Sequence, residues 1–277
     1  MSKQQRPVSV TTLAAMKTRG ERITCLTAYD ASLARVMTDL GVDIILVGDS
    51  LGMVVQGHDT TLPVTLDEMI YHSRCVARGM AQAHAQTRAR LPLLLVDLPF
   101  MSYASVDQAL HSAARLMKEG GAQMVKLEGG AAQAATVRAL SAQGIPVCAH
   151  LGLTPQSVHK LGGYKVQGRR AAEAETMVQD AQALQHAGAD LLLVECIPST
   201  LAARLRQTLD IPLIGIGAGA DCDGQVLVIT DVLGLSAQPP RFARDYAETH
   251  GSPVRAIRAF IEDVRAGTFP QAEHAFV

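Results

Sequence analysis

Short apolar runs recur along the chain and alternate with helical patterns. The runs are rich in Val, Ile and Leu and about 4 to 8 residues long, which is typical of strands buried on both faces. From Ala171 to His186, Val178, Ala181 and Leu184 recur at a three-residue step, and Gly188 follows as a stop. Eight strands are predicted, at residues 23–27, 43–47, 93–96, 124–127, 146–149, 191–194, 213–216 and 226–229.

This alternation predicts a parallel α/β architecture. Glycine-containing helix ends introduce four of the strands, in DLGVDIILV, KEGGAQMVKL, SAQGIPVCA and HAGADLLLV. Because no linker interrupts the 277 residues, we expect one closed (β/α)8 TIM barrel spanning residues 1–277. A doubly wound open sheet is the alternative that the pattern leaves open.

The terminal segments are expected to lie outside the barrel repeat. Residues 1–20 predict an N-terminal cap with a short helix, capped by Thr11 or Thr12 and ending near Gly20. Residues 250–277 predict a C-terminal helix and tail.

Two internal segments are long and polar. Ser50 to Thr65 exceeds a routine strand-to-helix connection and is a candidate active-site loop. Met80 to Arg90 carries no obvious chemistry, and we expect a solvated insertion there.

Composition excludes several classes of protein. A net charge of -1 gives no electrostatic reason to expect nucleic acid or an anionic membrane as a partner. No apolar stretch reaches the length of a membrane span, and the first residues lack an apolar signal region, so the cytoplasm is the expected location. The five cysteines are scattered, which indicates neither a disulfide framework nor a zinc cluster. Three of them, Cys25, Cys148 and Cys196, are expected within strands.

Ionisable side chains end five successive predicted strands, the second to the sixth. The carboxyl ends of barrel strands meet at one rim, where barrel enzymes have their active sites. Taken singly, such an Asp is often a turn residue or helix cap, such a His a packing residue, and such a Glu an ion-pair partner. Their recurrence at one rim favours a functional site. The rim residues are Asp49 and Ser50, Asp97, Lys126 and Glu128, His150, and Glu195.

Four of these side chains are carboxylates, which would repel one another unless a cation were present. Oxygen ligands with few His favour Mg²⁺ over zinc. Asp49, Asp97 and Glu128 follow neighbouring predicted strands, whereas Glu195 lies across the barrel mouth, where a carboxylate can accept a proton from the substrate. Lys126 can pair with an anionic substrate or with a developing enolate oxygen.

A glycine-rich segment, IGIGAGADCDGQ, follows the seventh predicted strand. Its backbone amides could bind phosphate, as in many barrels, or its glycines could allow close packing or substrate approach. Its glycines are too closely spaced for the dinucleotide-binding fingerprint.

Several long motifs closely resemble the ketopantoate hydroxymethyltransferase family, which catalyses the first step of pantothenate biosynthesis. The similarity extends from about Val10 to the C-terminal QAEHAFV. The motifs are TAYD (27–30), LVGDSLGMVVQGHDTTLPVT (46–65), DLPFMSY (97–103), MVKLEGG (124–130), HLGLTPQSV (150–158), GGYKVQGR (162–169) and IGIGAG (214–219).

The resemblance implies a barrel of the phosphoenolpyruvate/pyruvate superfamily and a Mg²⁺-dependent aldol-type transfer. The hydroxymethyl group of 5,10-methylenetetrahydrofolate would be added to C3 of 3-methyl-2-oxobutanoate, giving 2-dehydropantoate. It also implies a homo-oligomer, commonly a decamer, with a keto acid and a folate as its small-molecule partners.

The resemblance assigns roles residue by residue. It implies that Asp49 and Asp97 are metal ligands that also contact the substrate, and that Glu128 completes the metal site directly or through water. Ser50 and Lys126 would contact the keto acid, with His150 beside it. Glu195 would be the catalytic proton acceptor. The residues that contact folate are not assigned.

The chain departs from the family pattern at two places, and two other functions are considered. The Met80–Arg90 segment is longer than expected for the family, and Ala149 replaces a glycine that often precedes the motif histidine. An isocitrate-lyase-like enzyme would share the acids, but the chain lacks a KKCGH-type cysteine motif. A non-catalytic barrel would be expected to have lost some of the acids, all of which are present.

Overall fold

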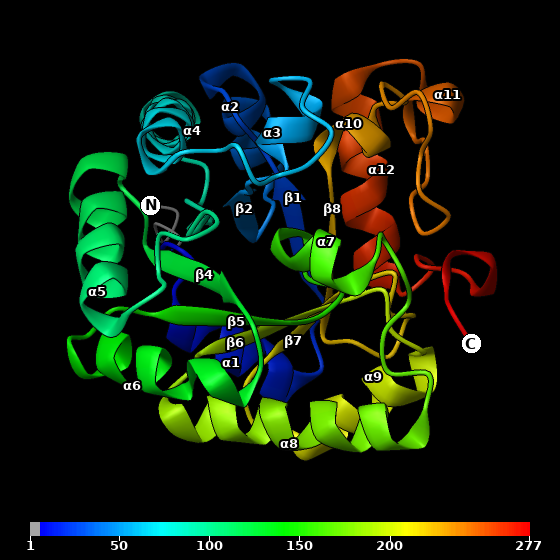
Figure 1. Ribbon diagram of the computed structural model, residues 1–277. Helices are drawn as coiled ribbons and strands as arrows, with labels where there is room; N and C mark the ends of the chain where they lie inside the picture. Colours follow the sequence, from blue (N-terminus) through cyan, green and yellow to red (C-terminus); the bar gives the residue numbers. More distant parts are fainter. Residues whose placement is uncertain (1–5) are drawn as a thin grey trace.

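The computed structural model describes residues 6–277, and its eight strands form a closed parallel barrel in sequence order (Figure 1). Strand β8 closes the barrel by pairing with β1, with Val226 beside Cys25. The (β/α)8 prediction is therefore confirmed, and the doubly wound alternative is wrong. The strands are β1 (Ile23–Thr27), β2 (Ile44–Val47), β3 (Leu93–Asp97), β4 (Met124–Glu128), β5 (Val147–Gly152), β6 (Leu191–Glu195), β7 (Leu213–Ile216) and β8 (Gly224–Leu227).

Helices surround the strands and cover their outer faces (Figure 1). Most strand residues are therefore buried on both sides, which explains why the strands are continuous apolar runs. The helices are α1 (Val10–Arg19), α2 (Ala31–Leu40), α3 (Leu51–Val54), α4 (Leu66–Thr87), α5 (Val106–Arg115), α6 (Ala134–Ala142), α7 (Val158–Leu161), α8 (Ala171–Ala187), α9 (Ser199–Thr208), α10 (Ile229–Val232), α11 (Ala247–His250) and α12 (Pro253–Ala266). A π-helical turn, η1 (Leu116–Gly120), continues α5, and the 3₁₀ turns are η2 (Ala131–Gln133), η3 (Pro155–Ser157) and η4 (Ala272–His274).

The N-cap of helix α1 lies two residues before the first of the predicted caps, Thr11. Ser9 is the N-cap: its Oγ accepts a hydrogen bond from the Thr12 amide at 3.3 Å, and Thr12 Oγ1 accepts one from the Ser9 amide at 3.2 Å. This reciprocal arrangement is a capping box in which Thr12 takes the third helical position. Gly20 ends the helix in a left-handed conformation, as predicted.

The Met80–Arg90 segment is mostly helix, so the prediction of a solvated insertion was wrong. Helix α4 continues to Thr87, with Met80 and Ala83 buried on its inner face and polar residues on its outer face. Gly79 allows this packing, since a Cβ there would lie 2.2 Å from the carbonyl oxygen of Ala31 at the start of α2. The long Ser50–Thr65 segment likewise contains a helical turn, α3.

An ion-pair network holds the amino-terminal end of the barrel, with Asp223, 1% exposed in its side chain, at the centre. Lys17 from α1 lies 2.9 Å from Asp223 Oδ2, and Arg206 from α9 lies 2.7 Å from Oδ1. The amide of Leu213 in β7 also donates to Oδ2, at 3.0 Å. One carboxylate thus connects α1, α9 and two strands.

We predict that Asp223→Ala lowers the free energy of unfolding by about 3 to 5 kcal/mol, because it leaves buried donors and two cations without their acceptor. Urea denaturation measures this loss. Glu175→Ala is the control, since it breaks an exposed pair with Arg204 and should leave the urea midpoint almost unchanged. Equal small losses in both variants would contradict the prediction.

Candidate active site

The structure brings all seven predicted site residues into one cavity of 540 Å³ at the carboxyl end of the strands. The cavity also has apolar walls from later segments of the chain. The residues from β2 to β6 are Asp49 and Ser50, Asp97, Lys126 and Glu128, His150, and Glu195.

Lys126 and Asp97 form a buried ion pair across β3 and β4. The barrel register places their Cα atoms side by side, and Lys126 Nζ lies 2.8 Å from Asp97 Oδ1. Burial lowers the pKa of Lys126, but Asp97, Glu128 and Asp49 outweigh it and raise the pKa above its usual range. Lys126 is therefore a fixed positive charge in the cavity.

His150 lies between two carboxylates. Its Nδ1 is 3.5 Å from Glu128 Oε1, and its Nε2 is 3.4 Å from Glu195 Oε2. Burial and Lys126 lower the pKa of His150, but Glu128 and Glu195 more than offset them and raise it to about 9. At neutral pH the ring is thus a cation between two acids. In the closed order β6 is opposite β2, so Glu195 faces Asp49 across the mouth as predicted.

Gln156 is a buried site residue that the sequence analysis missed. Its Nε2 donates to Asp49 Oδ2 at 2.8 Å and to the Leu98 carbonyl at 2.9 Å, and its amide N donates to Glu128 Oε2 at 3.0 Å. The Tyr103 hydroxyl donates to its Oε1. Because both Nε2 protons and the oxygen are engaged, the amide orientation is fixed. Gln156 lies inside the HLGLTPQSV motif, but a glutamine is uncharged and so was not singled out among the rim residues.

The Asp49 backbone amide donates to Asp97 Oδ2 at 3.1 Å, and the Asp97 charge acts on the Asp49 carboxyl, so the two side chains lie near each other. Burial, followed by the charges of Asp97 and Glu128, raises the pKa of Asp49 well above its usual range. Glu128 Oε1 is buried and receives no well-directed hydrogen bond within residues 6–277, whereas Asp97 Oδ1 is engaged by Lys126. Such a set of anionic oxygens is suited to a hard cation.

No group of three His, Cys, Asp or Glu side chains is placed to hold a metal ion anywhere in the described chain. Mg²⁺ is commonly held by one or two carboxylates, with waters and substrate oxygens completing its shell. The Asp49–Asp97 pair fits that mode. The contacts of Glu128 with Gln156 and His150 favour the alternative in which it reaches a metal through water.

The cysteines and the glycine-rich segment are best explained by packing. Cys25 and Cys148 lie within β1 and β5 as predicted, whereas Cys196 follows β6 by one residue, and burial raises the pKa of its thiol. After β7, a Cβ at Gly217 would lie 2.9 Å from the Phe242 ring and 3.1 Å from that of Phe276. These rings need a glycine beneath them, which favours the close-packing alternative over phosphate binding.

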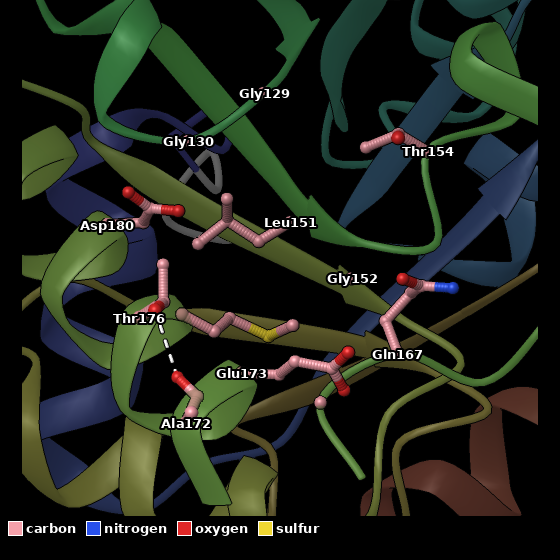
Figure 2. Close-up of a pocket in the computed structure, with 12 residues that line it drawn as sticks. Gly129, Gly130, Leu151, Gly152, Thr154, Gln167, Ala172, Glu173, Thr176 and Asp180 are labelled. Atoms are coloured by element: carbon pink, nitrogen blue, oxygen red, sulfur yellow. Dashed lines mark hydrogen bonds between the residues drawn. The ribbon is translucent and has the colours of Figure 1, made fainter. Parts of the chain in front are cut away.

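A second cavity, of 410 Å³, lies between α8 and the ends of β4 and β5 (Figure 2). Its polar groups are engaged with their own surroundings: Thr176 Oγ1 donates to the Ala172 carbonyl at 2.9 Å, and Asp180 Oδ1 accepts from the Ala131 amide at 2.9 Å. Asp180 thereby anchors the Gly129–Gly130 turn that follows Glu128. None of the predicted site residues lines this cavity. Its relation to the site is through Asp180, which holds the turn after Glu128.

The fold and the acid-lined mouth define a (β/α)8 barrel enzyme. Two solved structures share the fold: oxaloacetate acetylhydrolase in complex with 3,3-difluorooxalacetate (TM-score 0.59, 16% identity, covering 97% of this chain and 100% of that one) and 2,3-dimethylmalate lyase (TM-score 0.55, 17% identity, 88% and 87%). The latter is described as a member of the PEP mutase/isocitrate lyase superfamily, and both structures show the barrel fold that this chain shares.

The ketopantoate hydroxymethyltransferase family model matches residues 7–272. Proteins named 3-methyl-2-oxobutanoate hydroxymethyltransferase are similar over nearly the full length. The one from Halorhodospira halophila is 58% identical (97% of this chain, 94% of that protein), and the one from Methylococcus capsulatus is 53% identical (98% and 97%). The chain therefore belongs to the ketopantoate hydroxymethyltransferase family.

We predict that Gln156→Leu lowers the free energy of unfolding by about 3 kcal/mol, because Asp49, Leu98 and Tyr103 lose their buried partner. It should also reduce hydroxymethyltransferase kcat/KM at least tenfold, since Asp49 is then free to rotate. Gln143→Leu, an exposed change, is the control for both measurements. Wild-type kcat/KM in Gln156→Leu would remove Gln156 from the site.

We predict that His150 makes stability fall at alkaline pH. The folded pKa of about 9 exceeds the ordinary value of 6.5, so the folded state binds the proton more tightly. This stabilisation is complete below pH 6.5 and is lost as the pH rises through about 9, for a change on the order of 3 kcal/mol. Urea unfolding across this range in EDTA measures it. His150→Gln should remove that slope; an unchanged slope would mean that other groups cause it.

Proposed function

We propose that this protein transfers the hydroxymethyl group of 5,10-methylenetetrahydrofolate to C3 of 3-methyl-2-oxobutanoate, forming 2-dehydropantoate for pantothenate biosynthesis. The proposal rests on one observation: a single cavity brings together three groups. These are the Lys126 cation paired with Asp97, the neighbouring Asp49 carboxylate, and the Glu195–His150 pair. Membership of the family supports the same reaction.

The keto acid would be held by its oxygens. Its carboxylate and keto groups need positive charge and hydrogen-bond donors, which Lys126 and Ser50 can supply. Tyr29 lies 2.9 Å from Ser50, hydroxyl to hydroxyl, and so orients it. The negative charge that develops on the keto oxygen during proton loss would be stabilised by Lys126.

Asp49 and Asp97 would hold Mg²⁺, with Glu128 reaching it through water. When bound, Mg²⁺ supplies a Lewis acid that polarises the keto group and stabilises the enolate charge. The proximity of Asp49 to Asp97 and the buried Glu128 Oε1, which accepts no well-directed hydrogen bond from the described residues, support this assignment.

Glu195 would act as the base. The C3–H bond breaks, its proton moves to a Glu195 oxygen, and its electron pair enters the enolate. C3 then forms a bond to the one-carbon unit, and one water adds its hydroxyl to the same carbon, while the two C–N bonds that held this carbon to folate N5 and N10 break. The remaining water proton and the proton taken by Glu195 pass to these nitrogens, and tetrahydrofolate leaves. The His150 cation, 3.4 Å from Glu195 Oε2, would position this carboxylate.

The resemblance also supports a cytoplasmic homo-oligomer, which we propose to be a decamer. None of the helices described in residues 6–277 is long and apolar enough to cross a membrane.

An NMR time course with both substrates and Mg²⁺ tests the proposal, with EDTA as the metal control. We expect 2-dehydropantoate only when metal is present. Product in EDTA would exclude the metal requirement, and no product from protein that still binds the keto acid would exclude the transfer.

The Glu195→Gln variant tests the role of Glu195 as the base independently of substrate binding, again by NMR. Without folate in D₂O, we expect the wild type to exchange the C3 proton and this variant to lose exchange at least 100-fold while still binding the keto acid. Wild-type exchange by the variant would exclude Glu195 as the base.

A further inference from the structure

The site cavity has a second side that the keto-acid chemistry does not use. The residues assigned above come from the arc β2 to β6, whereas the wall over β7, β8 and β1 is formed largely by the segment after β8. Val228, Phe242 and Phe276 give this wall an apolar surface. Among the cavity-lining residues, Asp231 is the one acid outside the β2–β6 arc.

Asp231 is a buried carboxylate with unused hydrogen-bonding capacity. It lies in α10 just after β8 and is 6% exposed. Ser236 Oγ donates to its Oδ1 at 2.5 Å, while no described residue donates to its Oδ2 or pairs with it as a cation. Burial raises the pKa of Asp231, although the Ser236 hydrogen bond opposes the effect. Such an acceptor lines the cavity and is engaged by no described side chain, so it is available to a donor on a bound ligand.

Asp231 also lies beside the keto-acid side of the cavity. Ser50 and Asp231 line the same cavity, and the Tyr29 hydroxyl is 2.9 Å from that of Ser50. Burial is the main cause of the raised pKa of Tyr29, and the charges of Asp97 and Asp231 add to it. A ligand held by Asp231 would therefore adjoin a keto acid held by Ser50.

We propose that Asp231 binds the 2-amino-4-oxopyrimidine edge of the pterin ring of the one-carbon donor. That edge presents a ring N–H and an amino group side by side, and the two carboxylate oxygens match this donor pair. Oδ1 can accept from the ligand in addition to Ser236, because a carboxylate oxygen has more than one acceptor site. The apolar wall of Val228, Phe242 and Phe276 suits the faces of a flat ring. The inference rests on the proposed function, which supplies the identity of the donor.

The first test separates the two substrates kinetically. Asp231→Asn keeps the size of the side chain but replaces an acceptor with a donor, so we expect KM for methylenetetrahydrofolate to rise about 10- to 100-fold. KM for the keto acid should change less than twofold, and C3 exchange in D₂O, which needs no folate, should persist. Asp210→Asn, at an exposed site on the loop before β7, is the matched control.

The second test measures binding by calorimetry with tetrahydrofolate and its 2-desamino analogue. The wild type and Asp231→Glu, which retains the carboxylate, should prefer tetrahydrofolate at least tenfold, and Asp231→Asn should not discriminate. Should Asp231→Asn fail to fold, the absence of discrimination in the wild type would still overturn the proposal.

The outcomes distinguish this proposal from the proposed function. An unchanged donor KM, or equal losses for donor and keto acid, would show that Asp231 does not recognise the pterin. Absence of both exchange and product in the wild type would overturn the proposed reaction, and the calorimetric comparison would then decide the role of Asp231 by itself.

Discussion

The site depends on burying several like charges at one end of a barrel. Asp49, Asp97 and Glu128 are each at most 5% exposed, and carboxylates in such a place repel one another and lose hydration. Lys126 and His150, whose pKa is raised, supply positive charge, and Gln156 supplies directed hydrogen bonds. The compensation is incomplete, since Glu128 Oε1 lies 3.5 Å from His150 Nδ1 and accepts no well-directed hydrogen bond from the described residues. A bound cation or a polar substrate would complete it.

The two ends of the barrel bury carboxylates in different ways. At the amino-terminal end, Asp223 is buried with Lys17, Arg206 and a backbone amide, so its oxygens are satisfied by the protein itself. At the carboxyl end, the acids are held in place by Gln156 but not fully paired. The closed strand register allows this division, because it fixes Asp97 beside Lys126 and Glu128 beside His150 independently of any ligand.

Local sequence patterns predicted the strands and most of the site residues. The apolar runs identified all eight strands to within a few residues, because strands covered on both faces need apolar side chains throughout. The charges at strand ends identified the site, since a charge following such a run must lie near the rim. Gln156 was missed because it is uncharged and lies on a loop, so its role follows only from tertiary contacts. The end of α4 was misread because its outer polar residues outnumber the few buried ones, and the packing of Gly79 against Ala31 follows only from tertiary contacts.

The arrangement of the cavity also constrains where each of the two substrates would lie. The keto acid would contact the arc from β2 to β6, where the paired charges lie, and the second substrate must approach from the remaining side, over β7, β8 and β1. Glu195 stands at one edge of that opening, at the end of β6, and Asp231 lies within it, just after β8. A base at the edge and a recognition group within the opening would let proton removal and carbon transfer use the same small volume. Two flexible substrates would then be aligned by a rigid wall, which is the entropic advantage that a closed barrel offers.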